Sequence, residues 1–329
     1  MSKKVMLIGL GVWLIFMSAS AYSFWPFTVR SDMISYHAPC WGENNKIYFI
    51  KKVTFGRAIS GKTAVHVILF MGGSYFPDKT EVYLCSMNYD GTDKKEIVKI
   101  GDTDDDTYWL PMYLDYCKAN NLLLLSGGVH PARGTGDQGI YTIQTDGRGL
   151  KKISDKGMYA DWSPDGKRIV YGGGTIMNAD GTNHHPIIPE DSECWGKSHR
   201  FIWSPRGDLI AFTYKGWIWV MKPDGSERRK VCKNTHFYGW TPDGEGIVIE
   251  GGKLDGNYVC NSYVVGLDGK REKELKGVGY YSLDGKFRIH PLGFGVYNAE
   301  TGTRINPLAN IKRQEHKGHF VYKRPDNIW

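Results

Sequence analysis

A hairpin-like stretch recurs along the chain at a regular spacing. Its best-preserved copy is Asp161–Gly174, "DWSPDGKRIVYGGG", in which a strand end carrying an aromatic residue leads into a Pro-Asp-Gly turn and an apolar strand. Starting from Trp162, the aromatic position returns at Trp203, Trp240 and Tyr281, at spacings of 41, 37 and 41 residues. A repeat of this length predicts an array of identical supersecondary units.

Two looser copies begin at Pro39 and Asp115, so that six units can be counted. Each is followed by a second tight turn; these turns are "MNYDGT", "IQTDGR", "MNADGT", "MKPDGS", "VGLDGK" and "YNAETG". Asp-Gly accepts the positive φ of hairpin turns, so each unit is predicted to contain four antiparallel strands. The sequence therefore predicts an all-β fold, a single β-propeller of four-stranded antiparallel blades. The flanks 23–35 and 306–329 either complete a blade or form a seventh.

The repeat "WSPDGKRIVYGG" followed by "IMNADGT" resembles that of the TolB-like, WD-type β-propellers, over residues 36 to about 305. This resemblance implies the propeller fold. It says little about activity, because propellers serve as binding platforms, lyases, peptidase lids and subunits of larger enzymes.

The N-terminus has the pattern of an export signal. Lys3 and Lys4 precede the apolar stretch "VMLIGLGVWLIFM", and "SASAYS" follows it. This pattern predicts a signal peptide over residues 1–21 and one propeller domain over residues 22–329. We therefore expect an exported, periplasmic or equivalent extracytoplasmic protein with no stable membrane anchor after cleavage. The alternative is an uncleaved anchor, although 13 apolar residues are short for a membrane span.

Charge and cysteines exclude some classes of function. The formal net charge is +7, but basic residues are scattered among nearly as many acids and form no basic run with interleaved aromatics. Nucleic acid is therefore not an expected partner. The six cysteines are widely spread, and we expect some to be free and some paired. No C-x-x-C-H occurs, so no covalently bound haem is expected.

The tight turns predict which face of the propeller carries function. The first-to-second and third-to-fourth hairpins of every blade share one face, and the longer segments share the other, where binding residues are usually found. We assign to this loop face the segments 54–80, 127–139 and 184–200. The residues expected there as partner-docking candidates are Tyr75, Phe76, His130, Arg133, His184, His185 and Trp195.

Two groups on this face are candidates for metal binding. His199 and His236 begin innermost strands, and histidines near a central channel could hold a transition metal. Asp102, Asp104 and Asp106 lie in "DTDDD", and clustered carboxylates suit Ca²⁺, although the EF-hand spacing is missing. The alternative for both groups is an ordinary polar loop. Asp165, in the Pro-Asp-Gly turn, is expected to stabilise the turn rather than to act in catalysis.

The motifs do not predict an active site in this chain. There is no G-x-S-x-G elbow, P-loop or H-E-x-x-H. The best interpretation is a non-catalytic propeller subunit or scaffold of an extracytoplasmic complex, whose partners are other protein subunits. Two alternatives stay open: a metal-dependent propeller lyase or hydrolase acting on polysaccharide, and a TolB-like platform that binds periplasmic proteins.

Among exported propeller subunits, the chain is similar in build to the β subunits of hydrazine synthase from anammox bacteria. That resemblance implies a role in an oxidoreductase complex that makes hydrazine from nitric oxide and ammonium. The haems would then lie only in partner subunits, which are multihaem c-type cytochromes. It also implies seven blades, so a six-bladed ring would count against it.

Overall fold

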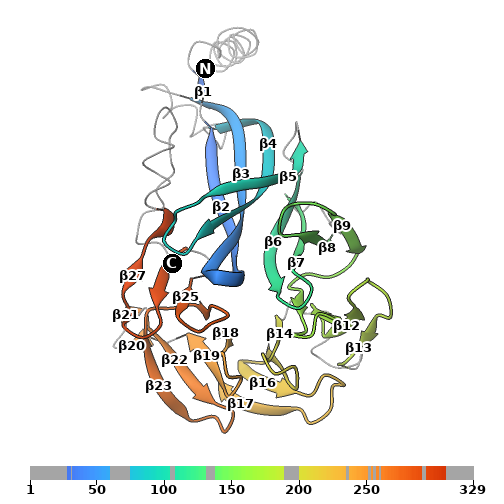
Figure 1. Cartoon of the computed structure of the whole chain (residues 1–329), viewed down its shortest axis with the longest axis vertical. Helices are drawn as coiled ribbons and strands as arrows, with labels where there is room; N and C mark the ends of the chain where they lie inside the picture. Colours follow the sequence, from blue (N-terminus) through green and yellow to red (C-terminus); the bar gives the residue numbers. More distant parts are fainter. Residues whose placement is uncertain are drawn as a thin grey trace, which may run out of the picture.

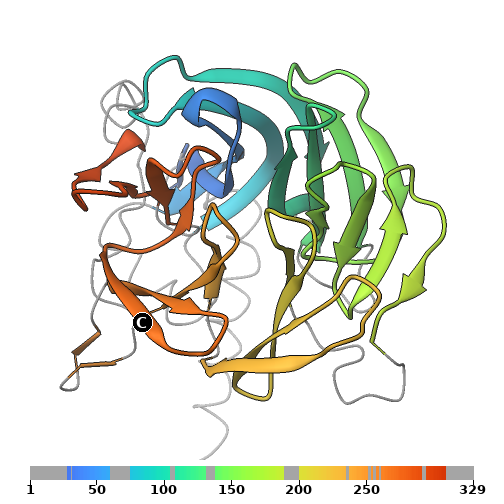
Figure 2. The ribbon, with the colours of Figure 1, turned by 60° about the horizontal axis from the view of Figure 1, so that its bottom comes forward.

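The computed structural model describes residues 28–30, 32–59, 75–103, 108–130, 138–188, 200–234, 237–250, 253–254, 257–258, 261–290 and 294–308. Within these residues the chain forms six blades of four antiparallel strands that surround one axis, and β1 adds a fifth strand to the sheet of the first blade (Figures 1 and 2). The prediction of an all-β propeller is therefore confirmed, with six blades.

Each blade uses strands in chain order, with the first strand innermost and the last at the outer edge. Blade one contains β2 (Met33–Trp41), β3 (Lys46–Ile59), β4 (Tyr75–Asn88) and β5 (Lys95–Thr103), and β1 (Thr28–Arg30) pairs with the far end of β3. Blade two contains β6 (Tyr108–Cys117), β7 (Leu122–His130), β8 (Gly139–Gln144) and β9 (Lys151–Ser154). Blade three contains β10 (Asp161–Trp162), β11 (Arg168–Tyr171), β12 (Thr175–Asn178) and β13 (His185–Pro186).

The other three blades follow the same order. Blade four contains β14 (Phe201–Trp203), β15 (Ile210–Tyr214), β16 (Trp217–Met221) and β17 (Arg229–Lys233). Blade five contains β18 (Phe237–Trp240), β19 (Gly246–Glu250), β22 (Asn261–Gly266) and β23 (Arg271–Lys276), with the small hairpin β20 (Lys253–Leu254) and β21 (Asn257–Tyr258) between its middle strands. Blade six contains β24 (Tyr280–Tyr281), β25 (Phe287–Ile289), β26 (Val296–Asn298) and β27 (Arg304–Ile305).

The aromatic residues of the repeat lie between neighbouring blades. Trp162, Trp203 and Trp240 are each at most 6% exposed. The indole of Trp240 donates a hydrogen bond to the Ile202 carbonyl of the preceding blade, 3.1 Å away. Trp41 repeats this contact with the Tyr280 carbonyl at 3.2 Å, which joins blade one to blade six. The same contact therefore links blade four to blade five and closes the ring between blades six and one.

The second turn of every blade packs against the blade before it. A Cβ on Gly181 would lie 2.2 Å from the Ile153 carbonyl oxygen, and a Cβ on Gly225 would lie 2.1 Å from that of Ile187. Such distances leave no room for a side chain. In the other four blades, a Cβ on the corresponding glycine would lie 2.2 to 2.8 Å from the nearest atom on the side of the preceding blade. These four glycines are Gly91, Gly147, Gly269 and Gly302, and all six glycines have positive φ.

The ring closes without a seventh blade among the described residues. Gly91 of blade one contacts Pro307, which directly follows blade six, as the other turns contact their preceding blades. The aromatic core between these two blades includes Phe49 and Phe294, whose ring centroids are 5.6 Å apart. The N-terminal flank is used by β1 and the start of β2, whereas most of the C-terminal flank lies outside the described residues.

The Pro-Asp-Gly turns have the structural role predicted for them. The Asp165 carboxylate accepts hydrogen bonds from the Ser163 hydroxyl at 2.6 Å and the Lys167 backbone N–H at 3.1 Å. These hydrogen bonds hold the pKa of Asp165 below its usual range. Asp165 is thus a turn residue.

The glycine contact can be tested with two matched substitutions. Gly225 and Gly216 have similar φ values of +81° and +77°, but a Cβ on Gly216 would meet nothing within 4 Å. Gly216→Ala should lower the free energy of unfolding by about 1 kcal/mol, because only the backbone is strained. Gly225→Ala should cost about 2 kcal/mol more, because the methyl group forces two blades apart. Urea unfolding measures both, and equal losses would contradict the packing role.

Candidate functional site at the axis and the loop face

The loop face is dominated by one long projection. β3 and β4 are each 14 residues long and stay paired as far as Ala58 and Tyr75. Figure 1 shows them continuing beyond the other blades towards β1. We call the part formed by residues 54–59 and 75–80 the arm. The segment 54–80 is therefore an extended hairpin at its base, while residues 60–74 lie outside the described part.

A polar network fixes the base of the arm. The Glu81 carboxylate accepts a hydrogen bond from the Tyr83 hydroxyl at 2.6 Å, and it forms ion pairs with Lys79 and Lys99, both at 3.1 Å. These partners, Tyr83 first, lower the pKa of Glu81 to about 2 and raise that of Tyr83 to about 12. Glu81 is only 15% exposed, whereas its partners Lys79 and Lys99 are 38% and 36% exposed. The arm is thus held by charge-assisted hydrogen bonds as well as by its strand ladder.

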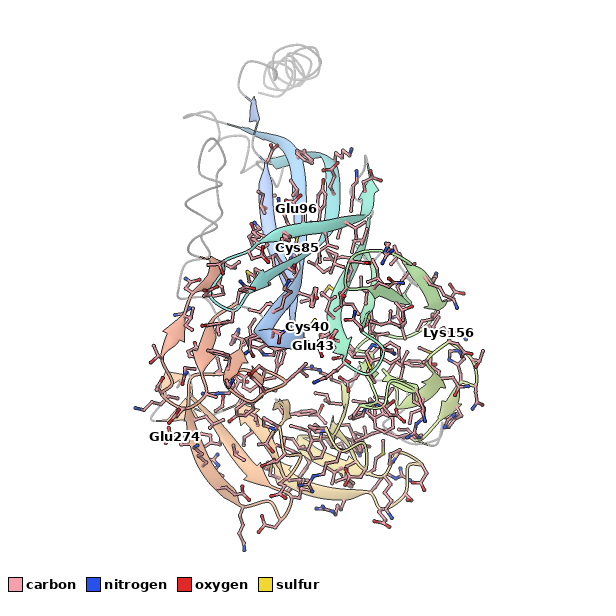
Figure 3. All side chains as sticks on the ribbon, viewed as in Figure 1. Cys40, Glu43, Cys85, Glu96, Lys156 and Glu274 are labelled. Atoms are coloured by element: carbon pink, nitrogen blue, oxygen red, sulfur yellow. The ribbon has the colours of Figure 1, made fainter. Side chains whose placement is uncertain are left out.

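The axis of the ring is lined by the innermost strands. One position per blade, directly before the aromatic residue of the repeat, lies at the same level of these strands. Its occupants are Cys40, Asp115, Asp161, Ile202, Gly239 and Tyr280. Figure 3 labels Cys40 in the central part of the ring. Two neighbouring blades therefore place carboxyl groups side by side near the axis.

Both axial carboxylates bind the backbone of the next blade. Asp115 accepts the N–H of Trp162 at 2.8 Å, and Asp161 accepts the N–H of Trp203 at 2.7 Å. Each acid thus ties its own innermost strand to that of the following blade. These backbone hydrogen bonds are a structural reason for an Asp directly before the aromatic residue.

Burial makes these two acids hard to ionise. Desolvation raises the pKa of Asp115 to about 6, against a smaller opposing effect of the backbone hydrogen bonds and of Arg200. Desolvation also raises the pKa of Asp161 well above its usual range, and the charge of Asp115 adds to this. The positive charge of Arg200 lowers the pKa of both acids and so opposes part of the effect of burial.

The remaining axial groups are also engaged or neutral. The Tyr280 hydroxyl donates a hydrogen bond to the Pro39 carbonyl, which joins blade six to blade one. The Cys40 thiol is buried, and desolvation raises its pKa well above the usual range, so it is not a thiolate nucleophile. The rings of Tyr113 and Tyr159 lie against one another, with centroids 4.2 Å apart. The axis is therefore built mainly from contacts between blades.

The predicted metal ligands are only partly within the described residues. Asp102 is exposed and pairs with Lys99 at 2.5 Å, which lowers its pKa. Asp104, Asp106, His199 and His236 lie outside the described residues, so neither the calcium site nor the histidine site is tested. Among the residues that are described, no group of three or more His, Cys, Asp or Glu side chains could hold a metal ion.

The docking candidates fall into two sets. Tyr75 and Phe76 lie on β4 at the end of the arm's described part, paired with Ala58 and Arg57, and His130 ends β7. These positions agree with a place on the loop face. Arg133 and Trp195 lie outside the described residues.

His184 and His185 are not on the loop face, which corrects the expectation from sequence. The His184 ring is hydrogen-bonded to the Gly181 carbonyl at 2.7 Å and to the Tyr171 hydroxyl at 2.8 Å. His185 pairs with Ile176 at the start of the outermost strand, directly after the tight turn. Both therefore lie beside the turn face, because they directly follow the turn at Gly181 and β13 begins at His185.

The axial acids were not predicted from the sequence. Asp161 was visible in the quoted repeat, and Asp115 begins a looser copy, so the signal was an acidic residue directly before the aromatic position in two consecutive units. The spacing of the repeats could not show that the two carboxylates lie close enough at the axis to interact. Cys40, Cys85, Cys117 and Cys232 are free, while Cys194 and Cys260 lie outside the described residues.

No protein-family model matches the sequence, and no curated protein matches it. Solved structures similar to this chain include an auxiliary nutrient binding protein from Bacteroides ovatus, with 14% identity and a TM-score of 0.38 over 74% of this chain. A eukaryotic initiation factor matches with 14% identity and a TM-score of 0.36 over 73% of this chain. The alignments span 57% and 54% of these two proteins.

The β-propeller domain of the Trilobed protease from Pyrococcus furiosus is also similar, with 10% identity and a TM-score of 0.33. That alignment covers 74% of this chain and 97% of the domain. Identities and scores this low give no ground for transferring a function. Among the helices of the described residues, none is long and apolar enough to cross a membrane.

The axial acids predict an unusual pH dependence. The pKa of Asp115 is about 6 in the fold against 3.8 ordinarily, so the folded chain holds this proton more tightly than the unfolded chain. Its contribution to stability is therefore greatest below about pH 4 and is lost as the pH rises through about 6. Asp115→Asn keeps an oxygen for the Trp162 N–H and should flatten this fall. Urea unfolding between about pH 4 and 8 tests it, with exposed Glu300→Gln as control; equal slopes would contradict it.

Glu81 predicts the opposite dependence. Its pKa falls from 4.5 to about 2 in the fold, so its stabilising effect is complete above about pH 4.5 and is lost as the pH falls towards 2. Glu81→Gln should therefore cost on the order of 1 kcal/mol at neutral pH and little in strong acid. Urea unfolding at several pH values, with the same Glu300→Gln control, measures this. A pH-independent loss would show that only packing had changed.

Proposed function

We propose that this chain is a non-catalytic β-propeller scaffold that binds other proteins through its loop face. The observation that carries the proposal is the arm, in which β3 and β4 remain paired as far as Ala58 and Tyr75, beyond the other blades. The base of the arm is buried at Thr54 and Thr80, and beyond it the paired strands present a stiff surface. Surfaces of this kind suit protein docking better than the binding of a small molecule.

The groups at the axis support the same conclusion. Among the described residues, Asp115, Asp161 and Tyr280 are polar groups that could act on a ligand there, and each already binds the backbone of a neighbouring blade. An acid that must hold a backbone N–H has little freedom to act as a general base in turnover. The axis is therefore better suited to stability than to catalysis.

A more specific proposal is that the scaffold belongs to an exported complex whose partners are c-type cytochromes, as in hydrazine synthase. This proposal rests on the export signal and the overall build. The six-bladed ring counts against membership of that seven-bladed family. Isolation from the native source with haem analysis tests it, since stoichiometric haem proteins should elute with the chain. Elution without haem would overturn it and leave the general scaffold role.

The general role is tested by shortening the arm. Phe55 pairs with Lys79, so residues 56–78 can be replaced by an Asn-Gly turn that joins these two positions. The ring should remain folded, because the core between blades one and six lies below this point. Partners that elute with the intact chain at fixed stoichiometry should be lost from the shortened one.

A substitution on the turn face serves as the control. Leu283 is 52% exposed beside the first turn of blade six, and Leu283→Ser should leave partner binding unchanged. The proposal is wrong if the intact chain elutes as a monomer, or if the shortened chain keeps its partners. A monomer that holds a tight transition metal and cleaves polysaccharide would establish the lyase alternative instead.

A further inference from the structure

The positive charge of the chain is concentrated at the outer edge of two neighbouring blades. Residues 227–233 and 270–276 carry eight basic and three acidic side chains, a surplus of five, whereas the whole chain has a net charge of +7. We call these eight basic residues the basic rim. They are Arg228, Arg229, Lys230 and Lys233 beside or on β17, and Lys270, Arg271, Lys273 and Lys276 beside or on β23.

The whole basic rim is exposed, and one of its members, Lys270, pairs with Asp268 at 3.4 Å. All eight side chains are classed as exposed, and Arg228, Lys233 and Lys273 form no ion pair with any described residue. Glu227, the only acid next to β17, pairs with Lys222 instead. The patch therefore keeps most of its charge for a partner.

Several of these cations rest on aromatic rings. Lys230 lies over Trp217 and Trp219, with its Nζ 4.9 and 5.4 Å from the ring centroids. Arg271 lies over Tyr263 at 4.3 Å. Aromatic residues beside basic ones are typical of the parts of interfaces that contribute most binding energy.

The two edges form one surface. Arg229 of blade four donates a hydrogen bond from Nη1 to the Leu267 carbonyl of blade five, 2.6 Å away. Arg271 of blade five is close enough to Cys232 of blade four to act on its thiol electrostatically. A partner that follows β17 would therefore also meet the cations of β23.

The outermost strands also offer backbone groups. β17 and β23 are the last strands of their sheets and, among the described strands, each pairs on one side only; the blade-five turn at Gly269 covers the Val231 carbonyl, so the other backbone groups of β17 are the ones on offer. An edge of this kind can accept an additional strand. Lysines and arginines along it disfavour pairing with a second copy, because two such edges repel each other. The same charges favour an acidic strand.

We propose that the basic rim binds an acidic, extended segment of a partner protein, which adds as a strand alongside β17 and is flanked by the cations of β23. This inference rests on the proposed scaffold function, because it names the chemistry of one partner. It assigns a second docking surface, separate from the arm. Backbone pairing gives the segment its direction, and its carboxylates pair with the rim.

The probe is a fluorescent peptide of alternating glutamate and threonine, with binding measured by anisotropy at about 0.15 M salt. Arg228→Glu/Lys233→Glu/Lys273→Glu should weaken binding about 100-fold, as expected for losing three contacts of about 1 kcal/mol each. The matched control is Lys151→Glu/Lys156→Glu/Lys167→Glu, which changes the net charge equally on blades two and three. Figure 3 labels Lys156 on the opposite side of the ring from Glu274 of β23. The control should bind nearly as tightly as the unaltered chain.

Further outcomes separate strand addition from simple charge attraction. The same peptide methylated at alternate backbone nitrogens should bind poorly, because it cannot complete the ladder. Equal binding of the methylated peptide, or equal losses in both triple variants, would overturn the inference. Tighter rim-dependent binding of polygalacturonate or of phosphatidylglycerol vesicles would also overturn it. If partners elute with the chain and depend on the arm but not on the rim, only this inference fails and the scaffold function stands.

Discussion

The contact of each blade with the one before it is the constraint on which the whole ring depends. A single four-stranded sheet cannot bury both of its faces, so it is stable only between two neighbours. Two recurring contacts set the spacing: an aromatic side chain at the end of the innermost strand, and a glycine in the second turn with no room for a Cβ. Because Trp41 and Gly91 of blade one repeat these contacts with blade six, the ring closes by packing.

This arrangement brings polar groups together at the axis, where they serve the ring. The carboxylates of Asp115 and Asp161 meet there because blades two and three are neighbours, and each is used to hold the next blade. Their ionisation is disfavoured by burial, which is a cost in stability at neutral pH. The backbone hydrogen bonds they accept offset part of that cost, so the fold retains acids where an apolar residue such as Ile202 is used elsewhere.

The surfaces proposed for binding lie at the periphery of the ring, since the described polar groups at the axis hold the blades together. The arm extends from the loop face, stiffened at its base by Glu81 and its partners, and the basic rim follows the outer edge of blades four and five. The two surfaces have different chemistry, one built from a long hairpin and the other from exposed cations over aromatic rings. A disc with separate surfaces can hold two partners at once, which suits a scaffold.

The sequence left open whether the flanks form a seventh blade, but by itself it determined the propeller fold, the six repeats and the role of Asp165. It could do so because turns and strands depend on residues close together in the chain, and the repeat shows the same local solution six times. Only the tertiary structure decided which residues of different blades meet: the axial acids, the glycines against the preceding blade, the place of His184 beside the turn face and the gathering of charge on β17 and β23. Those relations depend on the length of each strand. The repeat does not specify that length, since β13 has two residues and β3 has 14.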